Sequence, residues 1–133
     1  MSLSQEYRTD MYIKKDELVL ANPETSVIEL YQTMQKHRIH HIPVVENGKA
    51  VGIVSDRDVK FVSYSDGVTQ MMAGDIMTPK PYSVSETTEL EEVILTMATK
   101  EFNSVLINNS EGKITGIFTS KDALKLLAKT FLN

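Results

Sequence analysis

Residues 52–58 read GIVSDRD, and residues 116–122 read GIFTSKD. Both stretches run from a glycine through two apolar residues to a hydroxyl residue, and each ends on an aspartate three positions after that hydroxyl. An apolar run precedes each hydroxyl and a helical pattern follows it, so each stretch joins a predicted strand to a predicted helix. The same junction occurring twice in one short chain indicates a duplicated unit.

The repetition extends over most of the chain. A shift of 63 positions superposes two apolar sets, which are Val27, Leu30, Tyr31 and Met34 in the first copy and Leu90, Val93, Ile94 and Met97 in the second. Residues at i, i+3, i+4 and i+7 form one face of an amphipathic helix. After one inserted residue, a shift of 64 places Gly48, Gly52 and Asp58 on Gly112, Gly116 and Asp122. We therefore expect two copies of one fold.

Each copy predicts the element order β-α-β-β-α. A short extended stretch (residues 18–20 and 82–84) precedes the first helix. Ser26 with Glu29, and Thr88 with Glu91, have the spacing of capping boxes that open this helix. The remaining predicted elements are two apolar strands (42–45 with 50–54, and 105–107 with 114–118) and a closing helix (59–62, and 121–131).

The connections between these elements also follow from the sequence. Asn47 and Gly48 favour a tight hairpin between the first two strands, because both residues tolerate positive φ. The predicted boundaries are residues 12–62 for the first repeat, 63–74 for a linker and 75–131 for the second repeat. One unit of roughly 60 residues is marginal alone. We therefore expect an α/β (α+β) fold with two repeats packed sheet to sheet as one pseudo-twofold module.

The composition excludes several classes of function. The chain has 133 residues and a formal net charge of −4, which argues against a nucleic-acid partner. No cysteine is present, so disulfides, thiolate zinc sites and a cysteine nucleophile are excluded. No apolar run approaches the ~18 residues that span a membrane. Since no secretory signal opens the sequence either, we expect a cytoplasmic protein without a membrane partner.

The repeated motif has the chemistry of a nucleotide site. Ser55 and Thr119 can hydrogen-bond a phosphate or a sugar at the start of a helix, where backbone amides are unpaired. Asp58 and Asp122 can each accept two hydrogen bonds from a ribose diol. The same spacing also forms a helix cap that needs no ligand. Both interpretations can hold together, since a ligand can recruit a capping residue.

Further motifs identify a family resemblance. DIMTP at residues 75–79, HRIHHIPVV at 37–45 and the two GIVSDRD-like stretches occur in the order found in a tandem cystathionine-β-synthase (CBS) domain pair, or Bateman module. The resemblance covers about residues 12–131. The first copy departs from the pattern, because residues 13–16 (IKKD) match DIMTP poorly.

This resemblance implies a regulatory module and no enzyme. CBS pairs bind adenosine-containing ligands between their repeats, so AMP, ADP or ATP is expected first, with S-adenosylmethionine or NAD(H) as other options and no required cofactor. Carried over by position, Asp58 and Asp122 would accept the ribose, with Ser55 and Thr119 beside ribose or phosphate. The other ligand-binding residues that the resemblance implies are His40 and His41 for phosphate, and Tyr82, Ser83 and Val84 for adenine.

The resemblance also implies partners. CBS pairs usually form homodimers, and a sensor of this kind needs an effector protein whose identity the sequence does not give. The last predicted helix, with Leu124, Leu126, Leu127 and Phe131, has more apolar surface than one narrow stripe, which favours a second subunit there. A dimerisation or interaction module without ligand is the alternative function. An enzyme is disfavoured, because no nucleophile with an adjacent base and no P-loop is evident.

Several polar residues keep more than one interpretation. His37, His40 and His41 have the spacing of a helical metal site, but Pro43 should end the helix, which leaves surface or phosphate-binding histidines. Arg57 and Lys121 either lie beside phosphate or are solvated. The histidine pair corresponds to Asn103 and Ser104 in the second copy, which are less basic. If phosphates are held across the two repeats, the motif of Thr119 and Asp122 would use these histidines, so we rank it first.

Overall fold

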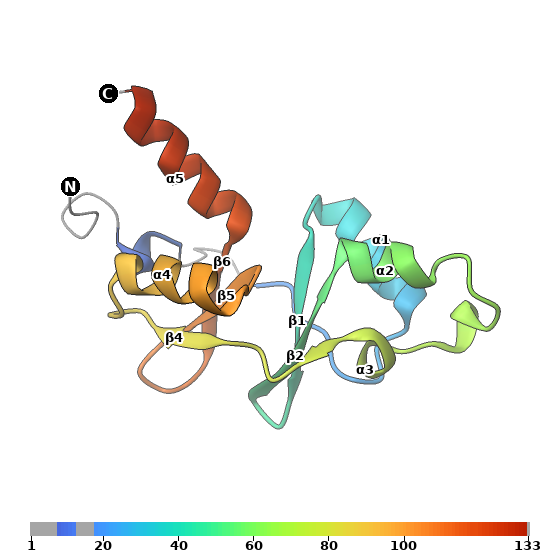
Figure 1. The fold of residues 1–133 in the computed structure, drawn as a ribbon. Coiled ribbons are helices and arrows are strands. Elements are labelled where there is room, and N and C mark those ends of the chain that lie inside the picture. The colour runs from blue at the N-terminus through green and yellow to red at the C-terminus, as the bar shows by residue number, and fades with distance from the viewer. Residues whose placement is uncertain (1–7, 13–17, 133) are drawn as a thin grey trace. The chain divides into compact units, whose positions relative to one another are not determined.

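The computed structural model describes residues 8–12 and 18–132. The chain divides into two compact units, each with its own sheet and core (Figure 1). We name them by their motif hydroxyls. The Ser55 unit comprises Val19–Pro81, and the Thr119 unit comprises Tyr82 onward together with the N-terminal stretch that contains the 3-10 helix η1 (Thr9–Tyr12).

The Ser55 unit is an antiparallel sheet with two helices packed beside each other. Its strands β1 (His41–Glu46) and β2 (Lys49–Ser55) form the hairpin, and its main helices are α1 (Val27–His37) and α2 (Asp56–Val62). The predicted hairpin turn is confirmed, since φ is 53° at Asn47 and 77° at Gly48. The remaining elements are η2 (Val68–Gln70), α3 (Ala73–Ile76) and β3 (Thr78–Pro79).

The third strand of this sheet comes from the second sequence repeat. The strand β3 lies within the DIMTP stretch and pairs antiparallel with β2, where Gly52 faces Pro79 and Ile53 faces Thr78. The sheet order is therefore β1-β2-β3. The sheet of the Ser55 unit is thus completed by residues whose motif marks the start of the second repeat.

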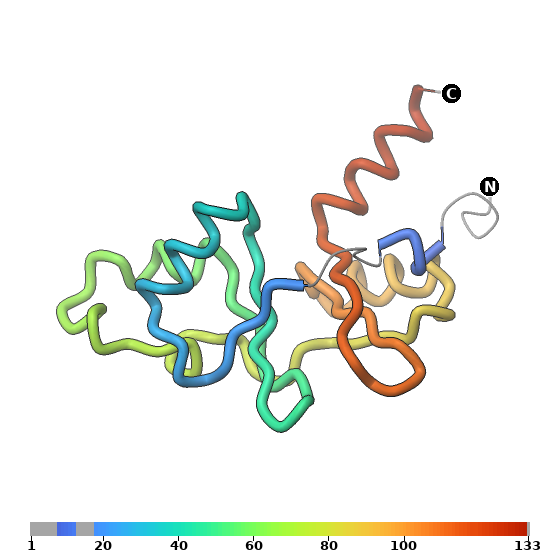
Figure 2. The backbone as a smooth tube through the Cα atoms, turned by 180° about the vertical axis from the view of Figure 1, so that it is seen from behind, coloured from blue at the N-terminus to red at the C-terminus, as the bar shows by residue number. Residues whose placement is uncertain are grey.

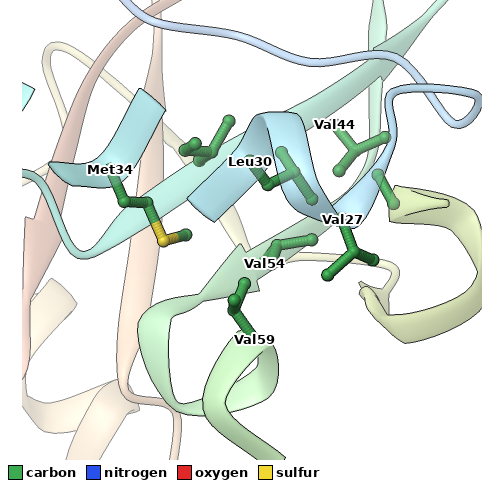
Figure 3. Packing of buried hydrophobic residues seen from close by; sticks show 8 residues of the cluster. Val27, Leu30, Met34, Val44, Val54 and Val59 are labelled. Carbon is green, nitrogen blue, oxygen red and sulfur yellow. The ribbon is translucent and has the colours of Figure 1, made fainter. Parts of the chain in front are cut away.

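The core of the Ser55 unit lies between α1 and the hairpin. Figure 3 shows Val27, Leu30 and Met34 of α1 pointing toward Val44 and Val54 of the two strands, with Val59 of α2 beside them. Leu30 is 1% exposed and Val54 is fully buried. The predicted apolar helix face is confirmed at these three positions of α1. Tyr31 is predicted on the same face, and this is wrong: it is 51% exposed, because helical spacing places it at the edge of the face formed by the other three residues.

The Thr119 unit has the full predicted order β-α-β-β-α. Its elements are β4 (Ser83–Ser85), α4 (Leu90–Lys100), β5 (Ser104–Asn108), β6 (Ile114–Thr119) and α5 (Ser120–Leu132). In the sheet β4-β5-β6, β4 runs parallel to β5, and β5 runs antiparallel to β6. Both backbone views show α5 extending away from this sheet (Figures 1 and 2).

The N-terminal helix η1 packs on the Thr119 unit. The Thr9 hydroxyl donates a hydrogen bond to the Thr88 carbonyl, and the Thr9 side chain is buried. The ring of Tyr12 meets Phe118 edge to face, with 4.7 Å between ring centroids. Residues near the start of the chain therefore complete the core of its last unit. The poorly matching stretch 13–16 lies outside the described residues.

Two local expectations need correction. Residues 18–20 form no strand, and the pairing at this place is a single parallel bridge from Ala21 to Val44. Thr88 does not cap the second helix: α4 begins at Leu90 after Glu89, and the Thr88 amide is used in a turn to the Ser85 carbonyl. Ser26 does cap α1, accepting a hydrogen bond from the Glu29 amide at 3.1 Å.

Candidate functional site

The motif of the Ser55 unit forms a complete capping box at the junction of β2 and α2. The Ser55 amide donates to Oδ2 of Asp58 at 2.8 Å, and the Asp58 amide donates to the Ser55 hydroxyl at 3.2 Å. Both side chains are half-buried. The capping interpretation of the motif is therefore confirmed for this copy, and it uses only one of the two carboxylate oxygens.

The motif of the Thr119 unit makes the same reciprocal pair at the junction of β6 and α5. The Thr119 amide donates to Oδ2 of Asp122 at 2.8 Å, and the Thr119 hydroxyl donates to that oxygen at 3.0 Å. The Asp122 amide points to the hydroxyl oxygen at 3.4 Å. Both copies thus fix their hydroxyl and carboxylate side by side, with Oδ1 of the aspartate outside the cap.

An ion pair lies beside the first motif. Nδ1 of His40 is 3.0 Å from Oδ2 of Asp56, and both side chains are partly exposed. Partial burial acts to raise the pKa of Asp56, but the hydrogen bond and charge of His40 and the charge of Lys60 outweigh it. The pKa of this carboxyl therefore lies below its ordinary value, and Asp56 is anionic near neutral pH.

The other predicted residues of the Ser55 unit surround the same junction. His41 pairs with Ser55 across β1 and β2, which places it next to the motif. Arg57, between the two motif aspartates, is exposed. The structure thus brings His40, His41, Ser55, Arg57 and Asp58 together at one end of the sheet.

The predicted adenine stretch lies at the motif end of the other sheet. The Leu106 amide donates to the Tyr82 carbonyl at 2.9 Å, and two positions earlier on β5 Ser104 pairs with Thr119. Ser83 and Val84 follow along β4. The structure therefore groups Tyr82, Ser83, Val84, Thr119 and Asp122 in one unit, with Lys121 exposed on the first turn of α5.

Sequence reasoning missed two features of this end of the Thr119 unit. The ring of Phe102 stacks on Tyr82, with 5.2 Å between centroids and 24° between planes. A groove of about 750 Å³ runs between α4 and α5, beginning at Asn103 and Ser120. Its walls are mostly apolar and include Met97, Leu124 and Leu127. An aromatic residue just after the helical pattern was the available signal for the stacked pair.

The described residues also bear on metal binding and membrane insertion. Over residues 8–12 and 18–132, no three histidine or acidic side chains gather in a way that could hold a metal ion. In the same part of the chain, none of the helices has the length and apolar character needed to cross a bilayer. The cytoplasmic location stays a prediction.

These two units define a tandem module in which, in each half, an antiparallel hairpin ends in a capped strand–helix motif. A model of the CBS domain family matches residues 11–64 and 73–129 of the chain. The chain therefore belongs to the CBS domain family and carries two such domains in tandem. The resemblance seen in the sequence is confirmed, as is the mixed fold with two three-stranded sheets.

Known proteins of this family are similar over most of the chain. Inosine-5′-monophosphate dehydrogenase of Korarchaeum cryptofilum is 31% identical over 115 residues, which cover 86% of this chain and 23% of that enzyme. The chain thus spans less than a quarter of that relative. The solved CBS domain pair of protein MJ0100, in complex with 5′-methylthioadenosine and S-adenosyl-L-methionine, is 22% identical with a TM-score of 0.79, covering 93% of this chain and 98% of that one.

A second solved structure is CBSX2 of Arabidopsis thaliana in complex with AMP. It is 24% identical to this chain with a TM-score of 0.71, and the match covers 93% of this chain and 98% of that one. At these identities the two structures establish the fold.

Proposed function

We propose that this protein is a regulatory CBS pair that binds an adenosine-containing ligand, with AMP, ADP or ATP preferred, and acts as an energy or metabolite sensor. The observation that carries the proposal is the orientation of the two motif aspartates. Among the described residues, the cap bonds of Asp58 and Asp122 all go to Oδ2, so Oδ1 remains for a ribose hydroxyl. A charged acceptor held rigidly by its own backbone suits a diol.

Two further points support this proposal. Proteins of the same fold hold AMP in one case and 5′-methylthioadenosine with S-adenosylmethionine in another. In this chain, Tyr82 and Phe102 provide a stacked aromatic pair at the motif end of the Thr119 unit, where an adenine ring could stack. Ligand binding would regulate an effector by favouring one conformation of the protein over another.

Calorimetric titration of the purified protein with AMP, ADP, ATP, S-adenosylmethionine and NADH tests the proposal. Replacing Asp58 or Asp122 by alanine should weaken binding by roughly 10- to 100-fold at its own motif, because a hydrogen bond to a charged group is lost. Ser26→Ala is the matched control, because it removes a helix cap outside both motifs and should leave affinity unchanged. Ligand recovered unaltered after the titration would agree with a binding role and no turnover.

Absence of binding by the wild-type protein at millimolar ligand would contradict the proposal. The alternative, a module for dimerisation or protein interaction without ligand, would then take precedence. If both aspartate variants bind with the same affinity as the wild type, the ribose must bind elsewhere than at the two motifs.

The groove between α4 and α5 favours a homodimer in either case. Leu124 is 65% exposed and Leu127 is 51% exposed on the groove-lining helix, so α5 presents apolar surface that a second copy would cover. Sedimentation velocity should find a dimer for the wild type and a monomer for Leu127→Lys. Phe61→Lys, at an 85% exposed position on α2 in the other unit, is the control that should stay dimeric. A Leu127→Lys protein that sediments like the wild type would exclude this interface.

A further inference from the structure

The two motifs differ in charge at one position where the backbone is the same. Asp56 in the first copy corresponds to Ser120 in the second. The Asp56 amide donates to the His40 carbonyl at 2.9 Å, and the Ser120 amide donates to the Asn103 carbonyl at 3.0 Å. The two side chains therefore leave the backbone at equivalent points of equivalent junctions.

Their side chains then make different interactions. The Asp56 carboxylate lies 3.0 Å from Nδ1 of His40. The Ser120 hydroxyl donates to the Asn103 carbonyl at 3.2 Å, in a bond between neutral groups. One junction thus carries a carboxylate next to its ribose-binding aspartate, and the other carries a neutral hydroxyl there.

The remaining charges leave this difference in place. Arg57 and Lys121 match each other in the two copies, as do the motif aspartates. Lys60, whose charge acts on Asp56, lies one helical turn further from the junction, where it offsets the carboxylate only in part. His40 adds a positive charge only when it is protonated.

We propose that Asp56 makes the motif of the Ser55 unit selective for adenosine ligands that lack a phosphate, whereas Ser120 leaves the motif of the Thr119 unit open to adenine nucleotides. This inference rests on the proposed function, namely ribose binding at both motifs. A 5′-phosphate is attached to the ribose ring through C5′ and its ester oxygen, so a ribose bound at Asp58 would hold its phosphate beside the same strand–helix junction that carries Asp56. A neutral thioether or a cationic sulfonium at the same carbon meets no repulsion from a carboxylate.

Coulomb's law sets the expected size. At a separation of about 6 Å in water, one carboxylate opposes a dianionic phosphate enough to weaken binding about tenfold. Both ligand chemistries occur in proteins of this fold, since MJ0100 holds a thioether and a sulfonium nucleoside and CBSX2 holds AMP. This chain would carry one motif of each preference.

The test isolates each motif and exchanges its charge. In an Asp122→Ala background, which leaves the Ser55 motif, Asp56→Asn should tighten AMP about tenfold and leave 5′-methylthioadenosine unchanged. In an Asp58→Ala background, which leaves the Thr119 motif, Ser120→Asp should weaken AMP about tenfold and again leave 5′-methylthioadenosine unchanged. Calorimetry gives the affinities of both ligands for each background with and without its exchange, and far-UV circular dichroism checks that each variant is folded. Asp56→Ser serves as the second neutral variant if Asp56→Asn does not fold.

The outcomes separate two failures. If the wild type binds neither ligand, the proposed function fails and this inference fails with it. If the wild type binds both ligands but neither charge exchange changes the ratio of the AMP and 5′-methylthioadenosine affinities, only the charge-selection inference is overturned. His40→Ala distinguishes the negative charge of Asp56 from its ion pair with His40, because it breaks the pair and keeps the charge. This variant should bind AMP as tightly as its parent or more weakly. A His40→Ala variant that tightens AMP as much as Asp56→Asn would also overturn the inference.

Discussion

The Ser55 unit and the Thr119 unit share a backbone scaffold and differ in what surrounds it. Each has an antiparallel hairpin and a reciprocal cap at the strand–helix junction. In the Ser55 unit α2 has 7 residues and packs beside α1, whereas in the Thr119 unit α5 has 13 residues and a groove separates it from α4. The two copies thus share the capped strand–helix junction and differ in the neighbouring charge and surface.

The largest expected effect concerns the two cores. Phe118→Ala should lower the free energy of unfolding by about 3–5 kcal/mol, because Phe118 is fully buried and its ring contacts Tyr12. Val54→Ala, at the equivalent and equally buried position of the other unit, should cost about 2 kcal/mol. Urea unfolding followed by circular dichroism measures both. If the two variants lose similar free energies of unfolding, then Phe118 contributes no more to its core than Val54 does to the other.

The next largest effect is expected at Gly52, where the side chain of Met77 lies close to the backbone. A Cβ added at Gly52 would lie 2.7 Å from Cγ and 3.0 Å from Cβ of Met77. Gly52→Ala should therefore destabilise the Ser55 unit by about 1–2 kcal/mol through overpacking. Adding Met77→Ala to this variant should recover part of the loss, because the shorter side chain removes the contact. A fully stable Gly52→Ala protein would mean that Met77 moves aside without cost.

The hairpin turns should respond equally in the two units. Gly48 and Gly112 have φ of 77° and 80°, and an added Cβ would meet nothing within 4 Å at either position. Alanine at each should cost about 1 kcal/mol, because the left-handed conformation is strained for residues with a side chain. Unfolding curves of the two variants compare the turns directly. A clear difference between them would break the equivalence of the hairpins.

The smallest expected effect is a pH dependence found in one unit only. The pKa of Asp56 is lowered, so its ion pair stabilises the protein above the ordinary value of 3.8 and loses this contribution as the pH falls through the lower folded value. Asp56→Asn should cost at most about 1 kcal/mol near pH 5, and the difference from wild type should vanish in stronger acid. Ser120→Asn should show no such trend. A loss for Asp56→Asn that persists in acid would assign it to packing.

Local signals in the sequence account for the parts of the fold that were predicted. The Asn47-Gly48 turn, the Ser26 cap and the apolar face of α1 depend on neighbouring residues, and all three are confirmed. The strand β3 has 2 residues, which is too short for a periodic pattern, and its pairing with β2 is long-range. The prediction that Thr88 caps the second helix failed. The Thr88 amide donates instead to the Ser85 carbonyl in a turn, and α4 begins only at Leu90.

The sequence also predicted part of the candidate site, but not its long-range contacts. The repeated motif identified its hydroxyls and aspartates, since repetition reveals them without a structure. The ion pair between His40 and Asp56 joins residues 16 positions apart, and it depends on β1 and β2 bringing them together. Its significance appears only when Asp56 is compared with Ser120, the neutral counterpart in the second motif.

The packing of η1 on the Thr119 unit affects the order in which the elements can fold during synthesis. Thr9 hydrogen-bonds a residue 79 positions later, and Tyr12 meets Phe118, close to the end of the chain. A polypeptide leaving the ribosome exposes Thr9 and Tyr12 long before Thr88 and Phe118, so their binding surface is complete only after Phe118 has emerged. The Ser55 unit can close its sheet once Pro79 has emerged. Among the described elements, the first helix to be synthesised is therefore among the last to pack.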